Sequence, residues 1–290
     1  MKKILLLLFL SVGQIYFAQQ QKDSLIFDAS QKTMWQTFTY DFGNIFKGMG
    51  YAYSRPLYWK GEQFKNFGYI AAGTSALYFV DDSVDDWANG WRKDVPSWLR
   101  DYGNDYGGPN INFRLTNAVY LVGLFTKNEK LRRTGVLLVS SAAAGGLLQQ
   151  VSKRIIGRAR PKANVGKDVF DPFHIDRVFN YDSFPSGHTI LGFTNAYILA
   201  KHFDNKWIKA GLYTVGTIPG IIRIVDRFHW LSDVAFSTAM SIFIVEAIDK
   251  FLNKKYDQKY NDDRDIIQKD KMVSWDLQMT PKSFGIAMRF

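Results

Sequence analysis

The chain has 290 residues, of which 47% are hydrophobic, so it can build a sizeable core and is not expected to be disordered. Its formal net charge of +10 favours an anionic partner, such as a phosphorylated small molecule or an anionic lipid surface, and we find no nucleic-acid-binding motif. Cysteine is absent, which excludes thiolate catalysis, disulfides, cysteine zinc sites and lipoprotein anchoring through a lipobox.

The first 18 residues have the pattern of a secretory signal peptide. Lys2 and Lys3 precede an apolar run over residues 4–12, and Ala18 has the small side chain of a cleavage edge. The run is too short to cross a bilayer. We therefore expect an exported protein that acts in the periplasm or cell envelope.

Residues 19–60 are polar and aromatic without a sustained period, which predicts an N-terminal extension packed on the main domain. The main domain is expected over residues 61–255 as an all-α, six-helix antiparallel bundle. Its predicted helices cover residues 64–80, 111–125, 135–151, 189–200, 207–222 and 234–252. The first of these is an apolar run that is long enough for a core helix and short for a membrane span.

Two other segments have no such pattern. The aspartates Asp81, Asp82, Asp85 and Asp86 precede a glycine-rich and asparagine-rich loop over residues 102–112. A site for a hard cation is one interpretation of the aspartates, but the spacing of a calcium loop is missing, so we expect a solvated helix end.

The last part of the chain, residues 256–290, is expected to be a charged linker followed by a short C-terminal β-hairpin. Residues 273–279 and 284–290 alternate in character around Thr280-Pro281-Lys282, a combination typical of two strands and a turn.

Three polar clusters lie at helix boundaries that an antiparallel bundle brings to one end. The first follows the third predicted helix, the second precedes the fourth, and the third joins the fifth to the sixth. In chain order the clusters are Lys153 with Arg160 and Pro161, then Pro185-Ser186-Gly187-His188, then Arg223 with His229 and Asp233.

The residue types in these clusters predict a site for an anion such as phosphate. Arginine offers a planar fork to phosphate oxygens and lysine a point charge. Ser186 and Gly187 stand at the start of a helix, where free backbone N–H groups favour an oxyanion. His229 and Asp233 are four residues apart, so the carboxylate can hold one imidazole nitrogen and leave the other to attack, while His188 can protonate a leaving oxygen.

The remaining cations and histidines are expected to be peripheral. We interpret Arg154, Arg158, Lys162 and Arg227 as solvated neighbours that raise the local potential. His174 and His202 are expected to have surface or structural roles, because a metal site built on them lacks partner spacing.

The three clusters resemble the signature of the type 2 phosphatidic acid phosphatase (PAP2) superfamily, which is similar in motif to bacterial class A acid phosphatases and vanadium haloperoxidases. The signature has three motifs. The first is a lysine followed, after six residues, by Arg-Pro, and the second is Pro-Ser-Gly-His. The third is Ser-Arg followed, after five residues, by a histidine and, after three more, by an aspartate. This sequence departs from it at Ile222, which stands where the family has serine.

The resemblance covers roughly residues 64–252 and implies a role for each matched residue. His229 would be the nucleophile that forms a phosphohistidine, Asp233 its orienting partner and His188 the acid. The phosphate oxygens would be held by Lys153, Arg160, Arg223, Ser186 and Gly187. No metal or other cofactor is implied, and the expected substrate is a phosphorylated lipid or a small phosphate ester.

Topology is a separate question, because many members of the family cross the membrane six times with the site facing away from the cytoplasm. If an exported chain crossed with all six predicted helices, the first cluster would lie on the cytoplasmic side. Two of the helices are also shorter than the roughly twenty residues of a span. We therefore favour a soluble or peripheral protein, and the alternative is a multi-pass protein with its site facing the periplasm.

Three functions are compatible with these residues. The first is a metal-independent phosphatase acting on a phosphomonoester or a diphosphate, such as a phosphatidate-like lipid or an isoprenyl diphosphate. The second is a vanadium-dependent haloperoxidase that uses the same cations to hold vanadate. The third is a non-catalytic envelope protein that binds an anionic lipid, although binding alone needs neither an acid nor a nucleophile.

Overall fold

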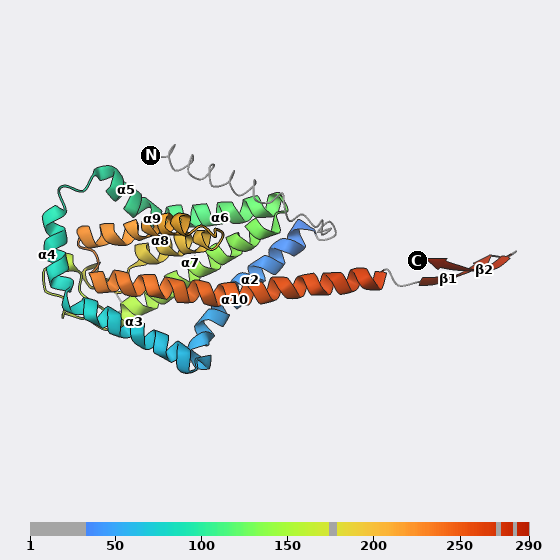
Figure 1. Cartoon of the computed structure of the whole chain (residues 1–290), viewed down its shortest axis with the longest axis horizontal. Helices are drawn as coiled ribbons and strands as arrows, with labels where there is room; N and C mark the ends of the chain where they lie inside the picture. Colours follow the sequence, from blue (N-terminus) through green and yellow to red (C-terminus); the bar gives the residue numbers. More distant parts are fainter. Residues whose placement is uncertain (1–32, 174–178, 271–273, 281–282, 290) are drawn as a thin grey trace. The chain divides into compact units, whose positions relative to one another are not determined.

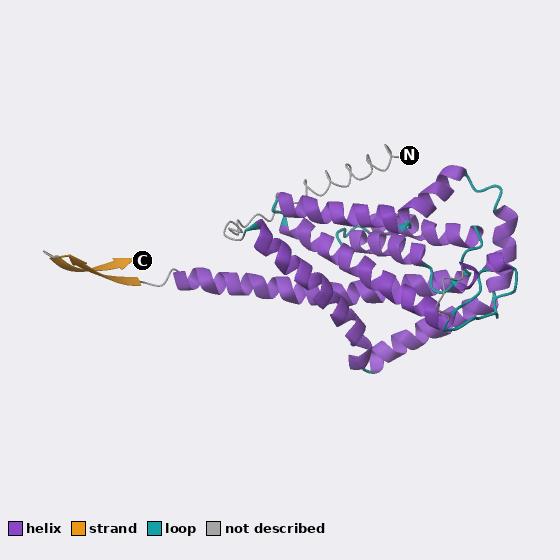
Figure 2. Cartoon of the chain, turned by 180° about the vertical axis from the view of Figure 1, so that it is seen from behind, coloured by secondary structure: helices purple, strands orange, loops and turns teal. Residues whose placement is uncertain are grey.

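The computed structural model describes residues 33–173, 179–270, 274–280 and 283–289. The expected signal peptide and His174 lie outside these residues. Two compact units divide at residue 248, and each is described by itself. Figure 1 labels the helices, and Figure 2 shows that helices make up nearly all of the first unit. The described helices are α2 (Met34–Ser54), α3 (Gly61–Phe79), α4 (Asp81–Trp91), α5 (Ser97–Tyr106), α6 (Pro109–Phe125), α7 (Glu129–Ile156), α8 (Gly187–Ala200), α9 (Lys206–Val225) and α10 (Leu231–Asp270), with the 3₁₀ turns Arg55–Tyr58, Pro161–Ala163 and Phe179–Tyr181.

The predicted all-α class agrees with the described part of the first unit, but the expected number of helices does not. The six predicted segments correspond to α3 and to α6 through α10, and three further helices are α2, α4 and α5. In the second unit, β1 (Ser274–Thr280) pairs antiparallel with β2 (Ser283–Arg289) in the segment where the sequence predicts a hairpin.

Helix α2 replaces much of the expected irregular extension. It begins with a capping box of two reciprocal hydrogen bonds. The backbone N–H of Gln36 donates to the side chain of Thr33, and the backbone N–H of Thr33 donates to the side chain of Gln36. Its buried residues are Asp41, Asn44 and Gly48, none of which is a large apolar residue. Hydrophobic periodicity therefore could not reveal the helix.

Helices α4 and α5 replace the predicted solvated helix end and much of the predicted loop. Asp81 and Asp85 stand four residues apart on α4 and are buried together with Ala88 on one face of the helix. Each of the two carboxylates pairs with an arginine from elsewhere in the chain. The expectation that this acidic segment is solvated is therefore wrong for Asp81 and Asp85.

The core of the first unit is built where helices approach closely at small residues. A Cβ atom placed on Gly135 of α7 would lie 2.4 Å from Cα of Tyr120 on α6, and one placed on Gly145 of α7 would lie 2.6 Å from Cγ2 of Ile190 on α8. A Cβ atom on Gly192 of α8 would lie 2.7 Å from Cγ of Pro219 on α9. These contacts set the spacing of α6, α7, α8 and α9, and the last three of these helices carry polar clusters at their ends.

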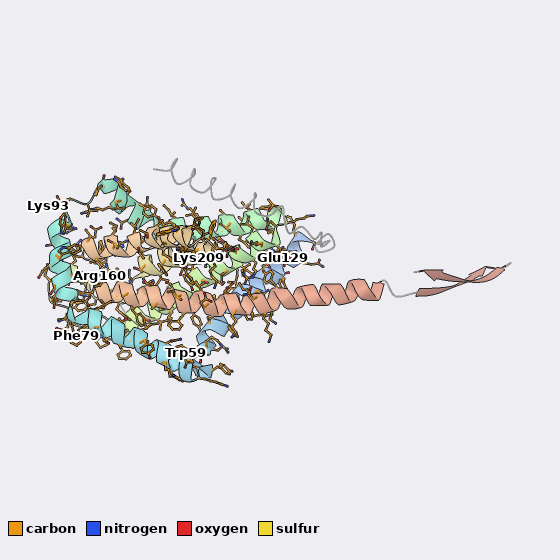
Figure 3. The ribbon with its side chains drawn as sticks, viewed as in Figure 1. Trp59, Phe79, Lys93, Glu129, Arg160 and Lys209 are labelled. Atoms are coloured by element: carbon orange, nitrogen blue, oxygen red, sulfur yellow. The ribbon has the colours of Figure 1, made fainter. Side chains whose placement is uncertain are left out.

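The expectation that the first predicted helix lies in the core is wrong. The corresponding helix, α3, has no buried residue, and Phe79 at its end is 79% exposed. Figure 3 shows Trp59 and Phe79 at the two ends of α3. Trp35, Phe46 and Trp87 on α2 and α4 are also exposed, so a large apolar surface faces outward.

Among the described residues, three helices are long and apolar enough to cross a membrane. They are α7, α9 and the segment Leu231–Tyr256 of α10. Together with the exposed aromatic side chains, these helices indicate an association with membrane.

Candidate functional site

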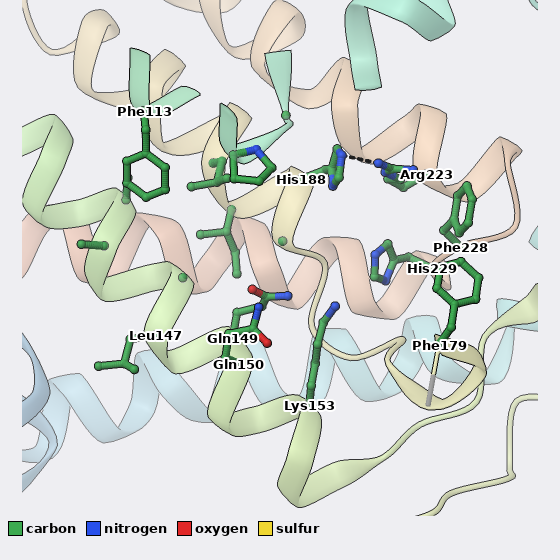
Figure 4. A pocket seen from close by; sticks show the side chains of 18 of the residues that line it. Phe113, Leu147, Gln149, Gln150, Lys153, Phe179, His188, Arg223, Phe228 and His229 are labelled. Atoms are coloured by element: carbon green, nitrogen blue, oxygen red, sulfur yellow. Dashed lines mark hydrogen bonds between the residues drawn. The ribbon is translucent and has the colours of Figure 1, made fainter. Parts of the chain in front are cut away.

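A cavity of about 660 Å³ lies between α6, α7, α8 and α9. Six of the eight predicted site residues line it, and they come from all three polar clusters: Lys153, Arg160, Gly187, His188, Arg223 and His229. Figure 4 shows Lys153, His188 and His229 pointing into this space from different parts of the chain. The prediction that the bundle brings the three clusters together agrees with this arrangement. Ser186 and Asp233 are buried behind the lining residues.

Three cationic side chains face the polar part of the cavity. Lys153 lies in the last turn of α7, Arg160 follows that helix, and Arg223 lies in the last turn of α9. The guanidinium of Arg160 stacks over Phe179 at 4.0 Å and that of Arg223 over Phe228 at 4.8 Å. In the described part of the chain, Nε of each arginine is buried without a hydrogen-bond partner. Both arginines can therefore donate to an anion in the cavity.

His229 is 4% exposed and lies in the turn between α9 and α10. Its Nδ1 hydrogen bonds with the backbone carbonyl of Ser183. A carbonyl can only accept, so Nδ1 carries the proton and Nε2 of the neutral ring keeps a free lone pair. Burial, together with the nearby cations Lys153, Arg160 and Arg223, holds the pKa of His229 well below 6.5. The ring is therefore neutral at physiological pH, as a nucleophile must be.

His188 stands in the first turn of α8, and its Nε2 hydrogen bonds with the guanidinium of Arg223. An arginine can only donate, so Nε2 is the acceptor. Burial and the neighbouring charges of Arg223, Lys153 and Arg160 lower the pKa of His188 to about 3. A phosphate that binds these cations would offset their effect and raise this pKa.

The start of α8 places Gly187 and Ser186 in different surroundings. Gly187 is the first residue of the helix and lines the cavity, where early backbone N–H groups lack partners within the helix. The backbone N–H of Ser186 instead donates to Oγ of Ser237 at 2.7 Å. It is therefore not free for an oxyanion.

The relationship between Asp233 and His229 differs from the expected direct hydrogen bond. Oδ2 of Asp233 lies 3.9 Å from Nδ1 of His229, which is too long for a hydrogen bond. The carboxylate of Asp233 instead accepts from Oγ of Ser183 at 2.6 Å, from the backbone N–H of Trp230 at 3.0 Å and from Arg158 at 2.6 Å. Asp233 and His229 are thus connected through Ser183.

The expectation that Arg158 is solvated is wrong. Its guanidinium is 3% exposed and binds both Asp81 and Asp233. Burial alone would lower the pKa of Arg158, but the two carboxylates together raise it. The spacing of Asp81 and Asp85 on one helix face was a signal for a buried acidic pair, which in a folded chain requires cationic partners.

Other peripheral predictions have mixed outcomes. Arg227 binds Asp85 through Nε at 3.0 Å and through its terminal nitrogen at 2.7 Å, so it is an ion-pair partner and not merely a solvated charge. Arg154 pairs with Asp182 at 3.3 Å. His202 contacts Oγ1 of Thr134 at 3.0 Å, as expected of a structural residue.

Ile222, where the family signature has serine, is 1% exposed. A Cβ atom placed on Gly103 of α5 would lie 2.7 Å from Cγ1 of Ile222, so the two residues are in close contact. The departure from the signature therefore replaces a hydroxyl with an apolar contact that packs α5 on α9, next to Arg223.

The part of the cavity away from the cations has an apolar wall that the sequence did not reveal. It is formed by α6, α7 and α8 through Phe113, Ala143, Gly146, Leu147, Ile190 and Leu191. Leu147, Val151 and Ile155 are 53%, 47% and 48% exposed and follow one another at intervals of four residues on α7. The cavity therefore borders an apolar stripe on the outside of the bundle.

Residues 134–257 match the model of the PAP2 superfamily. The chain is 32% identical over 153 residues to the lipid A 1-phosphatase of Porphyromonas gingivalis, covering 48% of this chain and 31% of that protein. It is 32% identical over 94 residues to the non-specific acid phosphatase of Providencia stuartii, covering 31% of this chain and 36% of that protein. The matches therefore span about a third of the length of these relatives.

Two solved structures are similar at 20% sequence identity. One is the transmembrane PAP2-type phosphatidylglycerolphosphate phosphatase of Bacillus subtilis, with a TM-score of 0.48 over 65% of this chain and 94% of that chain. The other is LpxE of Aquifex aeolicus, with a TM-score of 0.43 over 59% of this chain and 95% of that chain.

Proposed function

We propose that the protein is a phosphatase of the PAP2 superfamily, whose model residues 134–257 match, and that it hydrolyses a phosphomonoester or a diphosphate of a lipid. The observation that carries the proposal is the meeting of three cations and two neutral histidines at one cavity. The cations supply the charge stabilisation that a transferring phosphoryl group requires, so the reaction needs no metal ion.

In the first half of the reaction, Nε2 of His229 attacks phosphorus. The new bond is Nε2–P, and the bond that breaks joins phosphorus to the leaving oxygen. His188 takes up a proton from solvent once the bound phosphate raises its pKa, and gives that proton to the leaving oxygen. Lys153, Arg160 and Arg223 hold the phosphoryl oxygens, and Gly187 offers its backbone N–H at the start of α8.

In the second half, water attacks the phosphohistidine. His188, now without the proton it donated, takes a proton from the water as the P–Nε2 bond breaks and phosphate leaves. Nδ1 of His229 keeps its hydrogen bond to the Ser183 carbonyl throughout, and that bond stabilises the positive charge of the intermediate imidazole.

The apolar wall of the cavity supports a substrate whose phosphate is attached to a long apolar group. Such a group can lie along Phe113, Gly146 and Leu147 and leave the cavity beside the exposed stripe on α7. Two curated relatives are named lipid A 1-phosphatases, and one is named a non-specific acid phosphatase. The candidate substrates therefore include lipid A, phosphatidate-like lipids and isoprenyl diphosphates.

We also propose that the protein is membrane-associated, with the cavity on the non-cytoplasmic side. α7 and α9 both end at the cavity and α10 begins there, so three spans would place it on one side of the membrane. Lys127, Lys130 and Arg133 lie at the opposite end of α7, which is the cytoplasmic end by the positive-inside rule. Resistance to carbonate extraction would support spanning helices, and full release would support a peripheral protein.

The proposed function is tested by phosphate release from the purified full chain in the presence of a chelator. The panel contains lipid A, phosphatidate, phosphatidylglycerol phosphate, undecaprenyl diphosphate and a small aryl phosphate. We expect release from at least one lipid, and loss of that release in His229→Ala. Undiminished release by His229→Ala, or no release from any compound by the wild type, would overturn the proposal.

A further inference from the structure

A buried network of charged groups connects α4 to the turn that carries His229. Arg158 lies at its centre, where one terminal nitrogen donates to Asp233 at 2.6 Å and to Oγ of Ser232 at 2.8 Å. The other terminal nitrogen donates to Asp81 at 2.7 Å. Asp81 is 1% exposed, and its carboxylate also accepts from the backbone N–H of Ser232 at 2.9 Å.

The same network holds the carbonyl that orients the nucleophile. Ser183 is completely buried and is held at two points: its hydroxyl donates to Asp233 at 2.6 Å, and its backbone N–H donates to the carbonyl of Arg158 at 3.0 Å. Its own carbonyl accepts from Nδ1 of His229. A change in the position of Arg158 therefore moves both groups that hold Ser183, which are the Arg158 carbonyl and the Asp233 carboxylate, and Ser183 in turn orients the imidazole of His229.

We propose that Asp81 and Arg158 are positioning residues for His229, and this inference rests on the proposed function of the site. They hold Asp233 and Ser183 so that His229 keeps its proton on Nδ1 and presents Nε2 to the phosphate. Asp81 starts α4 and lies outside residues 134–257, the part that matches the family model. The region before that part thus contributes to the chemistry of the site.

The chain contains a matched control for this role. Asp85 lies one turn beyond Asp81 on the same helix, is also buried and binds Arg227 through two of its nitrogens. Asp85→Asn therefore removes a comparable ion pair that anchors α4 but does not touch the network around Asp233. A merely structural role of Asp81 predicts equal effects of the two substitutions.

The test compares Asp81→Asn with Asp85→Asn in the full chain. We expect Asp81→Asn to lower kcat on the order of 10-fold to 100-fold with KM within about twofold, because small displacements of a nucleophile cost this much. Asp85→Asn should retain kcat within about twofold. Nitrogen-15 spectra of labelled histidine should assign the proton of His229 to Nδ1 in the wild type and to a mixture of the two nitrogens in Asp81→Asn.

The histidine spectrum is readable because the chain has four histidines, and His229→Ala identifies the signal. Equal losses of kcat in the two variants, or an unchanged His229 signal in Asp81→Asn, would overturn the inference. Arg158→Lys provides a second test if Asp81→Asn does not fold, since lysine keeps the charge but cannot bridge both carboxylates. If the wild type releases no phosphate, the proposed function fails, but the spectra still decide the positioning role.

Discussion

The imidazole of His188 is hydrogen bonded to the guanidinium of Arg223, although both groups are basic. The contact exists because His188 is neutral and its Nε2 accepts the hydrogen bond. A phosphate that takes over the guanidinium frees this nitrogen and adds negative charge beside it. Under the proposed mechanism, substrate binding therefore prepares His188 to act as an acid.

The acid role of His188 predicts a dependence on the leaving group. His188→Ala should lower kcat about 10²-fold to 10⁴-fold for a lipid phosphate, whose alkoxide needs a proton to leave. For 4-nitrophenyl phosphate, whose phenolate leaves without a proton, the loss should be much smaller. His229→Ala should lose both activities. Equal losses for the two substrates in His188→Ala would contradict the assignment.

The low pKa values of the two histidines predict how stability changes with pH. A histidine whose pKa is about 3 in the folded protein and 6.5 in the unfolded chain binds fewer protons when folded between these values. The free energy of unfolding should therefore fall as pH decreases from about 6.5 towards 3, and the shift at His229 has the same sign.

Denaturant unfolding in detergent at several pH values between 7.5 and 4 measures this effect. His188→Asn should show a shallower loss of stability than the wild type over this range, because the variant has one fewer group that must stay neutral. The difference between the two curves isolates His188, since every other titrating group is shared. Parallel curves would mean that His188 does not titrate between the two states in this way.

The apolar wall of the cavity predicts a separation between large and small substrates. A Cβ atom placed on Gly146 meets nothing within 4 Å, so Gly146→Leu fills the cavity without a clash. We expect it to lower kcat/KM for a lipid phosphate by about tenfold or more, and to leave a small aryl phosphate within about twofold.

Gly211→Leu is the control for this substitution. Gly211 lies on α9, also has open space around it and is not among the residues that line the cavity. It should retain both activities. If Gly146→Leu reduced the activity on both substrates equally, the apolar wall would have no role in holding a lipid.

The pairing of α2 with the bundle predicts a large effect of one buried charge. Oδ2 of Asp41 forms an ion pair with Nε of Arg132 at 2.8 Å, although the angle is not that of an aligned hydrogen bond. The hydroxyl of Tyr120 also donates to Asp41 at 3.2 Å. Asp41→Asn leaves the buried guanidinium with only the more distant carboxylate of Glu129, at 3.8 Å, as a countercharge, and should lower the free energy of unfolding by about 3 kcal/mol.

The comparison is with Glu62→Gln, which breaks the ion pair of Glu62 with Lys65. Those side chains are 76% and 64% exposed, and the pair should contribute less than about 1 kcal/mol. Denaturant unfolding of both variants in detergent gives the two values. Similar small losses would mean that α2 is not held to α7 by this charge pair.

The sequence was a good guide to the cavity and a poor guide to what surrounds it. Six of the eight predicted residues line the cavity, because short-range spacing and the order of the helices place all three clusters at one end. Helix α2 was missed because its buried face is polar or small, and α3 was misjudged because its apolar residues face outward. Apolar composition indicates that a helix is buried from water, but it does not distinguish a protein core from lipid.

The sequence by itself determined the positions of the motifs, the class of the fold and the type of chemistry that we propose, since these depend on residue type and on spacing along single helices. Only the tertiary structure decided which carboxylate binds which arginine. Asp81 and Arg158 are 77 residues apart, and Arg158 and Asp233 are 75 apart. No local pattern connects residues at such separations, because their contact depends on how whole helices pack. The same packing decided that the partner of the His229 imidazole is the carbonyl of Ser183.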